Sequence, residues 1–380
     1  MTPAELFIGA TRSEVRALPP YNAGLSADSV RAQYGLARVA KLASNENPLG
    51  AGPRVEAALA HALAGGVSIY PDPSCDALRA ALAERVALSP ERLCFGNGSE
   101  DLLAVAAHTF LAPGDEVITV VPSFGLHIIY PQSAGANVKT VPMSALEFNV
   151  DALCAALSPR TRMLIVSNPS NPVGCAMNAA LIERLLSCVS PSTLVLWDEA
   201  YYEYARHAPD YADCLPLLAR SRSPWLMLRT FSKAYGLAGM RIGYGVASDA
   251  RLVDLMDRIR TPFGINHLAQ CAALAALADS AHVNASVAHV ECERERMRGA
   301  LVALGYMPAR SYANFLFFDT HEDASALSRR LLARGVIVKP WREAGYENCM
   351  RVSIGSGDDN DLFVDALARE RCAVAVRASH

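Results

Sequence analysis

The amino-acid sequence predicts an α/β fold, with a large domain built on a mostly parallel seven-stranded sheet between helices and a smaller α/β C-terminal domain. From about Leu93 onward, short apolar runs of strand-forming residues alternate with runs rich in Ala and Leu. This alternation is typical of a parallel sheet covered by helices. The runs 163–166 and 194–197 are apolar throughout, as expected of strands buried on both faces. The pattern changes near residue 262, where a Pro-Phe-Gly triplet interrupts a helical run.

The expected elements follow this alternation along the chain. For the large domain we expect strands at 93–95, 116–120, 136–141, 163–167, 194–197, 225–230 and 242–246. For the smaller domain we expect a final helix, helices at 286–304 and 324–333, and strands at 315–318, 336–338 and 351–354. The apolar stretch 268–278 is too short to cross a bilayer and contains Gln270, so we interpret it as a buried helix. The first forty residues are weakly periodic, and the predicted division is an N-terminal arm at 1–40, a large domain at 41–262 and a small domain at 263–380.

Composition and charge exclude several classes of protein. The 380 residues are 52% hydrophobic and 19% charged, which argues against a disordered or collagen-like chain. Since 35 basic residues balance 38 acidic ones, no nucleic-acid partner is expected. The ten cysteines form no C-x-x-C pair, so neither a disulfide framework nor a metal site is predicted. Residues 1–21 lack the apolar core of a signal peptide, and we expect a cytoplasmic protein that does not enter a membrane.

The strongest local signal lies at residues 229–244, which overlap the end of the strand expected at 225–230. This segment places Lys233 where the strand ends, among small and aromatic residues. Partial burial there would lower the pKa of the amine and favour the neutral form that attacks carbonyl groups. Eight residues later, Arg241 offers a planar guanidinium group suited to a phosphate. An isolated Ser-Lys pair more often lies in a surface turn. The interpretation of Lys233 as a reactive amine therefore depends on the small and aromatic residues around it.

A second signal is the segment 194–201, in which an apolar strand ends on Asp198. Ligands of such sheets bind beyond the carboxyl ends of the strands, so a buried aspartate there needs a cationic partner. The nitrogen of a pyridinium ring is one such partner, and an aspartate that faces it tunes pyridoxal phosphate. Tyr201 is close enough in sequence to contact the phenolic oxygen of the same ring. The alternative is that Asp198 caps a helix.

Two further loops follow other expected strands. The loop 96–101 precedes a helical run, whose first free amides could bind a phosphate. The loop 167–174 contains two Asn-Pro steps that favour a rigid extended backbone, and Asn171 could donate its amide to a ring oxygen. Either loop alone is weak evidence, because ordinary turns use the same residues. Together, however, four strand ends present groups that suit one phosphorylated pyridine aldehyde.

Over essentially its whole length the chain resembles the class I and II pyridoxal-phosphate aminotransferases of fold type I, and most closely the histidinol-phosphate aminotransferases among them. The resemblance is carried by the loops just described and by the segments 41–48, 70–73, 198–201, 229–244 and 350–355. It implies pyridoxal 5'-phosphate as cofactor and small-molecule substrates. The implied reaction converts L-histidinol phosphate and 2-oxoglutarate to imidazole acetol phosphate and L-glutamate, as in histidine biosynthesis.

The resemblance also implies roles for individual residues. Lys233 would bind the cofactor covalently and then move a proton as general base and acid. Asp198 would pair with the ring nitrogen, and Phe124 would stack on the ring. The residues expected to hold the phenolic oxygen and the phosphate are Asn171, Tyr201, Ser99 and Glu100 through their amides, Thr230, Ser232 and Arg241. Tyr70 would reach the cofactor phosphate of a neighbouring subunit, which implies a homodimer with shared sites.

Substrate identity depends on three further residues. Arg351 matches an arginine that binds the substrate carboxylate in amino-acid aminotransferases and the substrate phosphate in the histidinol-phosphate enzymes. Tyr21 lies in an arm motif that lacks the second proline of the family pattern, and Lys339 stands where many members carry arginine. These departures leave two alternatives open, an aromatic or broad-specificity amino-acid aminotransferase and a phospho-amino-acid decarboxylase. A non-catalytic binding module is not favoured, because it would be expected to lose Lys233.

Overall fold

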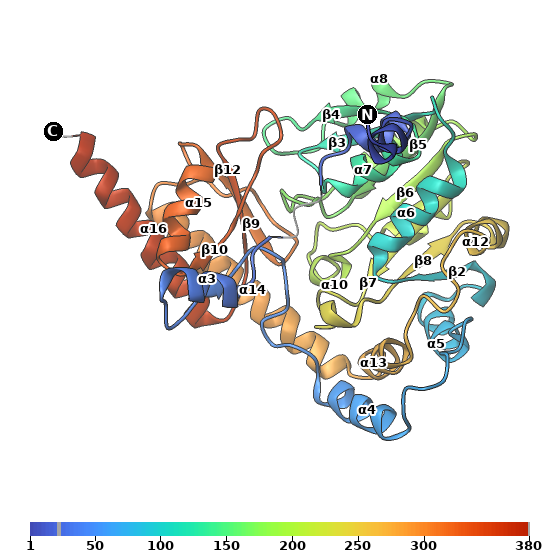
Figure 1. The fold of residues 1–380 in the computed structure, drawn as a ribbon, viewed down its shortest axis with the longest axis horizontal. Coiled ribbons are helices and arrows are strands. Elements are labelled where there is room, and N and C mark those ends of the chain that lie inside the picture. The colour runs from blue at the N-terminus through green and yellow to red at the C-terminus, as the bar shows by residue number, and fades with distance from the viewer. Residues whose placement is uncertain (21–23, 379–380) are drawn as a thin grey trace.

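The computed structural model describes residues 1–20 and 24–378, with a large sheet flanked by helices and a separate smaller sheet (Figure 1). The α-helices are α1 (Pro3–Gly9), α2 (Ser13–Ala17), α3 (Ala27–Tyr34), α4 (Pro53–Ala64), α5 (Asp76–Val86), α6 (Ser99–Phe110), α7 (Leu126–Ser133), α8 (Val150–Ala156), α9 (Ala179–Cys188), α10 (Tyr202–Ala205), α11 (Cys214–Leu218), α12 (Ala250–Asp257), α13 (His267–Leu277), α14 (Ser280–Ala303), α15 (Ala324–Ala333) and α16 (Gly357–Ala378). The strands are β1 (Ala40–Lys41), β2 (Leu93–Gly96), β3 (Glu116–Val121), β4 (Asn137–Pro142), β5 (Thr161–Ser167), β6 (Leu194–Asp198), β7 (Trp225–Thr230), β8 (Gly243–Ala247), β9 (Phe315–Asp319), β10 (Val336–Ile337), β11 (Lys339–Pro340) and β12 (Cys349–Ser353).

The central sheet confirms the predicted fold class. Within the described part of the chain it has seven strands in the order β2-β8-β7-β6-β5-β3-β4. Strand β8 runs antiparallel to β2 and β7, whereas the pairs among β7, β6, β5, β3 and β4 are parallel. All seven strands begin and end within two residues of the positions expected from the sequence. The carboxyl ends of the parallel strands therefore meet at one edge, where ligands of such sheets bind.

Helices cover both faces of this sheet because successive side chains of each strand point to opposite faces. Val195 and Trp197 of β6 lie in one hydrophobic cluster. Their neighbours Leu194 and Leu196 lie in another, which also holds residues of α6 and α12. A strand that packs apolar groups on both faces is necessarily apolar throughout, which explains why these runs are visible in the sequence.

The C-terminal part of the chain forms the antiparallel sheet β11-β12-β9. Helix α15 begins and ends as expected, and α14 begins six residues before the helix expected at 286–304. The two-residue strand β11 was not expected from the sequence. Strand β1 pairs with β10 in parallel, so the residues that follow the arm pack against the C-terminal part. The division into arm, large domain and small domain stays a prediction.

Residues 1–20 and 24–40 contain three short helices. Arg12 beside α2 donates to the carbonyl oxygen of Ser133 on α7 at 2.9 Å. Among the described residues, no helix combines the length and apolar character needed to cross a membrane. The same residues contain no group of three or more metal-ligating side chains.

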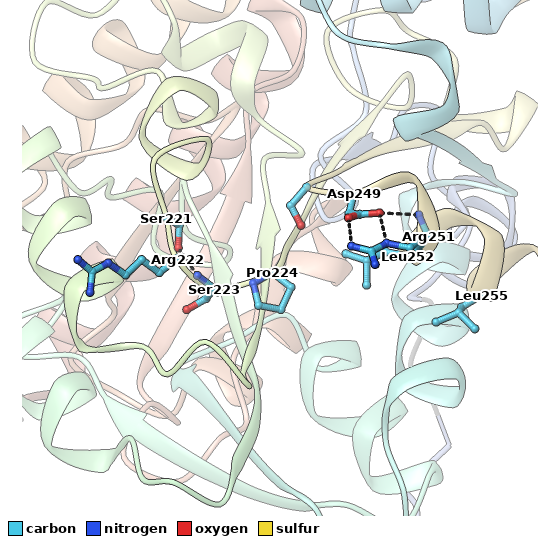
Figure 2. A pocket seen from close by; sticks show the side chains of 9 residues that line it. Ser221, Arg222, Ser223, Pro224, Asp249, Arg251, Leu252 and Leu255 are labelled. Atoms are coloured by element: carbon cyan, nitrogen blue, oxygen red, sulfur yellow. Dashed lines mark hydrogen bonds and ion pairs between the residues drawn. The ribbon is translucent and has the colours of Figure 1, made fainter.

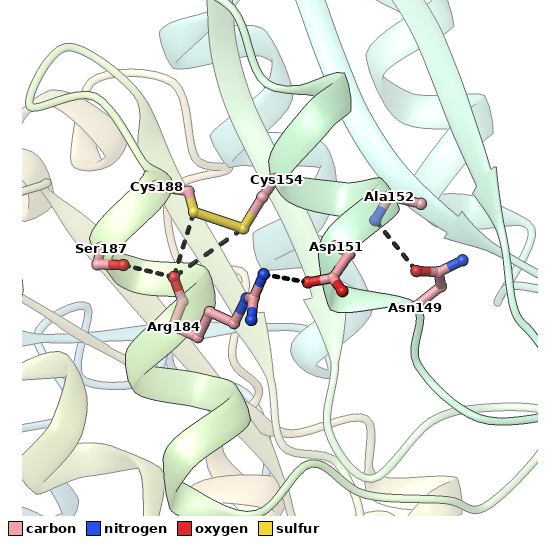
Figure 3. The surroundings of a disulfide bond; sticks show 7 residues. All are labelled: Asn149, Asp151, Ala152, Cys154, Arg184, Ser187 and Cys188. Atoms are coloured by element: carbon pink, nitrogen blue, oxygen red, sulfur yellow. Dashed lines mark hydrogen bonds and ion pairs between the residues drawn. A yellow bond between two sulfur atoms is a disulfide. The ribbon is translucent and has the colours of Figure 1, made fainter.

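One disulfide corrects the expectation from the cysteine spacing. Cys154 of α8 and Cys188 of α9, 34 residues apart, are joined (Figure 3). The same two helices are linked by an ion pair between Arg184 and Asp151. Cysteine spacing failed to predict the pair because it carries no information on which helices pack side by side.

Candidate active site

A cavity of about 410 Å³ lies at the carboxyl ends of the parallel strands. The predicted site residues that line it are Ser99, Glu100, Phe124, Asn171, Asp198, Tyr201, Thr230, Ser232, Lys233 and Arg241. Lys41, Ser44 and Glu46, which the sequence did not single out, also line it. The fold thus brings together residues that are as far apart in the sequence as Ser99 and Arg241.

Lys233 lies in the loop that follows β7, half-buried in the cavity. Its Nζ donates to the carbonyl oxygen of Ser44 at 3.2 Å. Burial, with further contributions from the charges of Arg351 and Arg241, lowers the pKa of the amine to about 8. A lysine with this pKa is partly neutral near neutral pH, so it can act as a nucleophile or a base.

Asp198 ends β6 and is buried at the floor of the cavity. One carboxylate oxygen lies 3.1 Å from Nε2 of His127, and the other accepts from the backbone N–H of Ala200 at 3.0 Å. The helix-cap alternative is not confirmed, because the N-cap residue of α10 is Tyr201 and Asp198 instead holds the turn that precedes the helix. A carboxylate fixed in this way remains available to a cation within the cavity.

His127 is the main residue of the site that the sequence analysis missed. The sequence analysis assigned it no role, but it lies on α7 with its side chain buried against Asp198. Its Nδ1 lies 3.3 Å from Oγ of Ser123. No local pattern indicated this role, because the contact joins α7 to the end of β6, 71 residues away.

The two residues predicted to hold the phenolic oxygen are contacted by the C-terminal part and by the segment after β1. Tyr201 accepts at its hydroxyl from the side-chain amide of Asn45 at 2.9 Å. Asn171 accepts at Oδ1 from the guanidinium group of Arg351 at 2.6 Å. This contact orients the amide and leaves its NH₂ group for a ligand, which agrees with the predicted donation to a ring oxygen.

Two glycines bring the backbone close to Arg241 and Ser99. A Cβ atom on Gly98, whose φ is +88°, would lie 2.6 Å from Nη2 of Arg241. A Cβ atom on Gly243 would lie 2.2 Å from the backbone nitrogen of Ser99. Since no side chain fits at either position, the start of α6 can approach both β8 and the guanidinium group.

The groups around this close approach form a cradle for an anion. Thr230 and Ser232 place their hydroxyl oxygens 3.0 Å apart, and the guanidinium group of Arg241 lies 3.7 Å from the carboxylate of Glu100. Free amides at a helix start, hydroxyl groups and a guanidinium group together favour a phosphate. We call these five residues, Ser99, Glu100, Thr230, Ser232 and Arg241, the phosphate cradle.

The comparisons with known proteins agree with this arrangement. The sequence profile of the family described as "Aminotransferase class I and II" matches residues 37–367. The chain belongs to this family. The aminotransferase is 48% identical over 359 residues to histidinol-phosphate aminotransferase 1 of Mesorhizobium japonicum, with 94% of this chain and 97% of the relative covered. It is 46% identical to histidinol-phosphate aminotransferase 3 of Rhizobium meliloti, with 94% and 96% covered.

Its fold is similar to that of a solved relative as well. The crystal structure of histidinol-phosphate aminotransferase from Sinorhizobium meliloti in complex with pyridoxal-5'-phosphate superposes with a TM-score of 0.88 at 28% identity. This similarity covers 96% of the aminotransferase described here and 98% of the relative.

Three of the described site residues that the sequence predicted do not line the cavity. Arg351 is buried on β12, within 6.0 Å of the ring centre of Trp341, and Lys339 is its register partner on β11. Tyr70 is 78% exposed and stacks on Phe263 with ring centroids 4.7 Å apart. Tyr21 lies outside the described residues.

A buried ion pair below the cavity was also not expected. Arg229 of β7 donates to one carboxylate oxygen of Glu199 from Nε at 2.9 Å and from Nη2 at 2.7 Å. Tyr202 covers the guanidinium group at 3.4 Å from its ring centre. Because Glu199 follows Asp198 and Arg229 precedes Thr230, the pair fixes the ends of β6 and β7 relative to each other.

A second hollow, of about 460 Å³, lies at the opposite end of β7 and β8 (Figure 2). It is lined by Ser221, Arg222, Ser223, Pro224, Ser248, Asp249, Arg251, Leu252 and Leu255. Asp249 caps α12 and accepts from Nε of Arg251 at 2.9 Å. The two opposite charges therefore lie within one local pair, which Figure 2 shows.

Proposed function

We propose that this aminotransferase binds pyridoxal phosphate and transfers the amino group of L-histidinol phosphate to 2-oxoglutarate, giving imidazole acetol phosphate and L-glutamate. The observation that carries the proposal is the presence of the phosphate cradle, Lys233 and Asp198 around one cavity. The names of the Mesorhizobium and Rhizobium relatives support the substrate. The solved relative with pyridoxal-5'-phosphate supports the cofactor.

The cavity residues fit this cofactor. The phosphate cradle would hold the phosphate group, Asp198 the ring nitrogen, and Asn171 with Tyr201 the phenolic oxygen, while Phe124 would cover the ring. The glycine contacts support this fit, because a Cβ atom on Gly98 would reach the guanidinium group of Arg241. When bound, pyridoxal phosphate supplies an electron sink for the substrate carbon.

Lys233 supplies the acid and base of the reaction. Its Nζ would accept the proton from the substrate carbon that bears the amino group and return a proton on the cofactor side. A pKa of about 8 suits both directions, because the amine and its conjugate acid are both populated near neutral pH. Asp198, held by His127 and Ala200, would keep a negative charge next to the ring nitrogen.

The substrate anion would be bound on the side of the C-terminal sheet. Arg351 and Lys339 occupy directly opposed positions on β12 and β11, so two cationic side chains belong to neighbouring positions of this sheet. Burial and the neighbouring charges of Arg351 and Arg342 lower the pKa of Lys339, and an anion placed between them would relieve this repulsion. Arg351 would serve a substrate carboxylate equally well, which keeps an aromatic or broad-specificity aminotransferase as the second candidate.

We further propose a cytoplasmic homodimer in which Tyr70 completes the partner's cofactor site. Tyr70 is excluded from the cavity of its own chain, and the neighbouring Val67 and Ile69 are 67% and 84% exposed. An exposed group of large apolar side chains favours a protein interface. Sedimentation velocity is expected to give twice the mass of the chain, and a monomer with full activity would contradict this proposal.

The substrate proposal is tested by the visible absorption spectrum of the protein loaded with pyridoxal phosphate. Titration with L-histidinol phosphate is expected to convert the spectrum to the amino form of the cofactor at far lower concentration than titration with L-phenylalanine. Lys233→Ala serves as the control that should not turn over. If phenylalanine reacts at the lower concentration, the broad-specificity alternative replaces the proposal. If carbon dioxide is released from a phosphorylated amino acid, the enzyme is a decarboxylase.

A further inference from the structure

The loop between β11 and β12 docks on the end of β3 in the central sheet (Figure 1). Oε2 of Glu343 in this loop accepts from the backbone N–H of Ser123 at 2.9 Å and from the indole N–H of Trp341 at 2.5 Å. The hydroxyl of Tyr346 donates to the carbonyl oxygen of Val121 at 3.2 Å. Two side chains of one loop therefore anchor the C-terminal sheet to neighbouring points of the central sheet.

On the side of the central sheet, a chain of contacts runs from Ser123 through His127 to Asp198, the carboxylate proposed to face the cofactor. Its Oγ lies 3.3 Å from Nδ1 of His127, and Nε2 of the same ring lies 3.1 Å from Asp198. All three side chains are buried. A displacement of Ser123 would therefore disturb the contact between His127 and Asp198, since the members of a buried hydrogen-bond network depend on one another.

On the side of the C-terminal sheet, Trp341 lies between Glu343 and Arg351. The guanidinium group of Arg351 is 6.0 Å from the centre of the Trp341 ring, whose edge also packs on Phe317. The carboxylate of Glu343 thus contacts two residues, Trp341 and Ser123. The first packs on Arg351 and the second contacts His127.

We propose that Glu343 is a positioning residue that couples the placement of Arg351 to the hydrogen-bond chain Ser123–His127–Asp198. The inference rests on the proposed function, because Asp198 must face the ring nitrogen for the coupling to matter. Loss of the carboxylate leaves two N–H donors unsatisfied and frees Ser123 to move. The expected result is weaker cofactor binding, although Glu343 itself does not line the cavity.

The test compares three variants of the full-length protein. Glu343→Ala is expected to raise the dissociation constant of pyridoxal phosphate, measured on the apo-protein by absorbance, by about five- to thirty-fold. It should also raise KM for the amino donor. Glu343→Gln keeps an oxygen acceptor and should restore most of the affinity. Tyr346→Phe removes the other anchor of the same loop and is expected to change the affinity by no more than about twofold.

A double-mutant cycle separates coupling from loop anchoring. Ser123→Ala removes the hydroxyl that contacts His127 but keeps the N–H that binds Glu343. If Glu343 acts through this chain, the double variant Glu343→Ala/Ser123→Ala loses clearly less affinity than the product of the two single losses. If Glu343→Ala fails to fold, judged by the melting temperature of the apo-protein, Glu343→Leu, which removes the acceptor but keeps most of the side-chain volume, replaces it in the cycle.

Three outcomes would overturn the inference. They are unchanged cofactor affinity in Glu343→Ala, equal losses in Glu343→Ala and Tyr346→Phe, and strictly multiplicative losses in the cycle. Asp198→Ala distinguishes these from an error in the proposed function. If Asp198→Ala binds the cofactor as tightly as the wild type, the assignment of the cofactor site is wrong. If it binds weakly while Glu343→Ala does not, only the coupling is wrong.

Discussion

Two hollows of similar volume lie at opposite ends of β7 and β8, about 410 Å³ at the carboxyl end of β7 and about 460 Å³ at its amino end. The two hollows differ in the elements that supply their lining residues. The first receives residues from the ends of β5, β6 and β7, from the start of α6 and from the segment after β1. The second receives only the residues that precede β7 and those that follow β8. Volume therefore does not identify the site, whereas convergence of strand ends does.

The electrostatics of the two hollows differ in the same way. In the first, Lys233 has a lowered pKa because burial and two arginines disfavour its charge. In the second, Asp249 and Arg251 neutralise each other at the surface, and Arg251 is exposed. The pKa of Lys233 is thus shifted by burial and by charges from other elements, whereas the pKa shifts of Asp249 and Arg251 come chiefly from their own pair, and a shift of the first kind is more typical of a functional site.

The largest expected difference between the two hollows comes from removing one cation from each. Lys233→Ala is expected to reduce kcat by about 10²–10⁴-fold or more, because both the nucleophile and the proton carrier are lost. Arg251→Ala in the second hollow should change kcat by less than about twofold. Steady-state assays of both variants check this. Retention of wild-type turnover by Lys233→Ala would remove the basis for placing the chemistry in the first hollow.

The next difference concerns one carboxylate from each hollow. Asp198→Asn keeps the shape of the side chain but removes the negative charge next to the ring nitrogen. A lost charge-assisted hydrogen bond corresponds to about a 10- to 150-fold decrease in kcat/KM. Asp249→Asn, the matched change at the other end of the sheet, should have little effect on kcat/KM. Equal losses in the two variants would mean that Asp198 acts only by capping its turn.

These contrasts also show which features a sequence can predict. Strands β5, β6 and β7 were predicted because a strand buried on both faces is a continuous apolar run. Strands β1 and β11 contain two residues each, too few for any periodicity, and they exist because a neighbouring strand offers them hydrogen bonds. The fold class was therefore predictable, but the way in which the arm end joins the C-terminal part was not.

The same limit applies to the site. The position of Lys233, Asp198 and Arg241 around one cavity was predictable, because each lies in a short segment next to a predicted strand. The contacts of His127 and Glu343 were not predictable, since they involve residues 71 and 220 positions away. The pairing of Cys154 with Cys188 depends in the same way on the packing of α8 against α9. A sequence indicates local chemistry well and tertiary support poorly.

The next prediction concerns the rate at which the amine of Lys233 in the apo-protein reacts with the cofactor aldehyde, and how this rate depends on pH. Only the neutral amine attacks the cofactor aldehyde. Because burial lowers the pKa to about 8, the rate of capture by the apo-protein should rise about tenfold per pH unit below pH 8 and level off above it. An exposed lysine in a model peptide, measured in parallel by absorbance, should keep rising to about pH 10.4. A protein profile that follows the peptide would show that the environment of Lys233 does not favour the neutral amine.

The smallest expected effect is on stability. The folded-state pKa of Lys233, about 8, lies below its ordinary value of 10.5, so the unfolded chain holds more protons between these two pH values and the apo-protein gains stability as the pH rises through this range. Below pH 8 the buried charge destabilises the folded state in full. Lys233→Met removes this charge and should raise the melting temperature of the apo-protein at pH 7 by about 1–4 °C. Arg251→Met, at the exposed position of the second hollow, should not raise it.

The pH dependence of this difference distinguishes charge from packing. If Lys233→Met raises the melting temperature by removing a buried charge, the difference from the wild type should shrink steadily between pH 8 and pH 10.5. Over this range the wild-type amine is neutral in the folded protein, and the free energy needed to deprotonate it from the unfolded chain falls as the pH rises. A gain that is constant over this range would instead come from the packing of the methionine side chain. Thermal unfolding of the two apo-proteins at pH 7, 8.5 and 10 is sufficient to decide. The residue whose removal costs the most activity would then also be one whose removal stabilises the fold, as expected where a site maintains an unfavourable charge for catalysis.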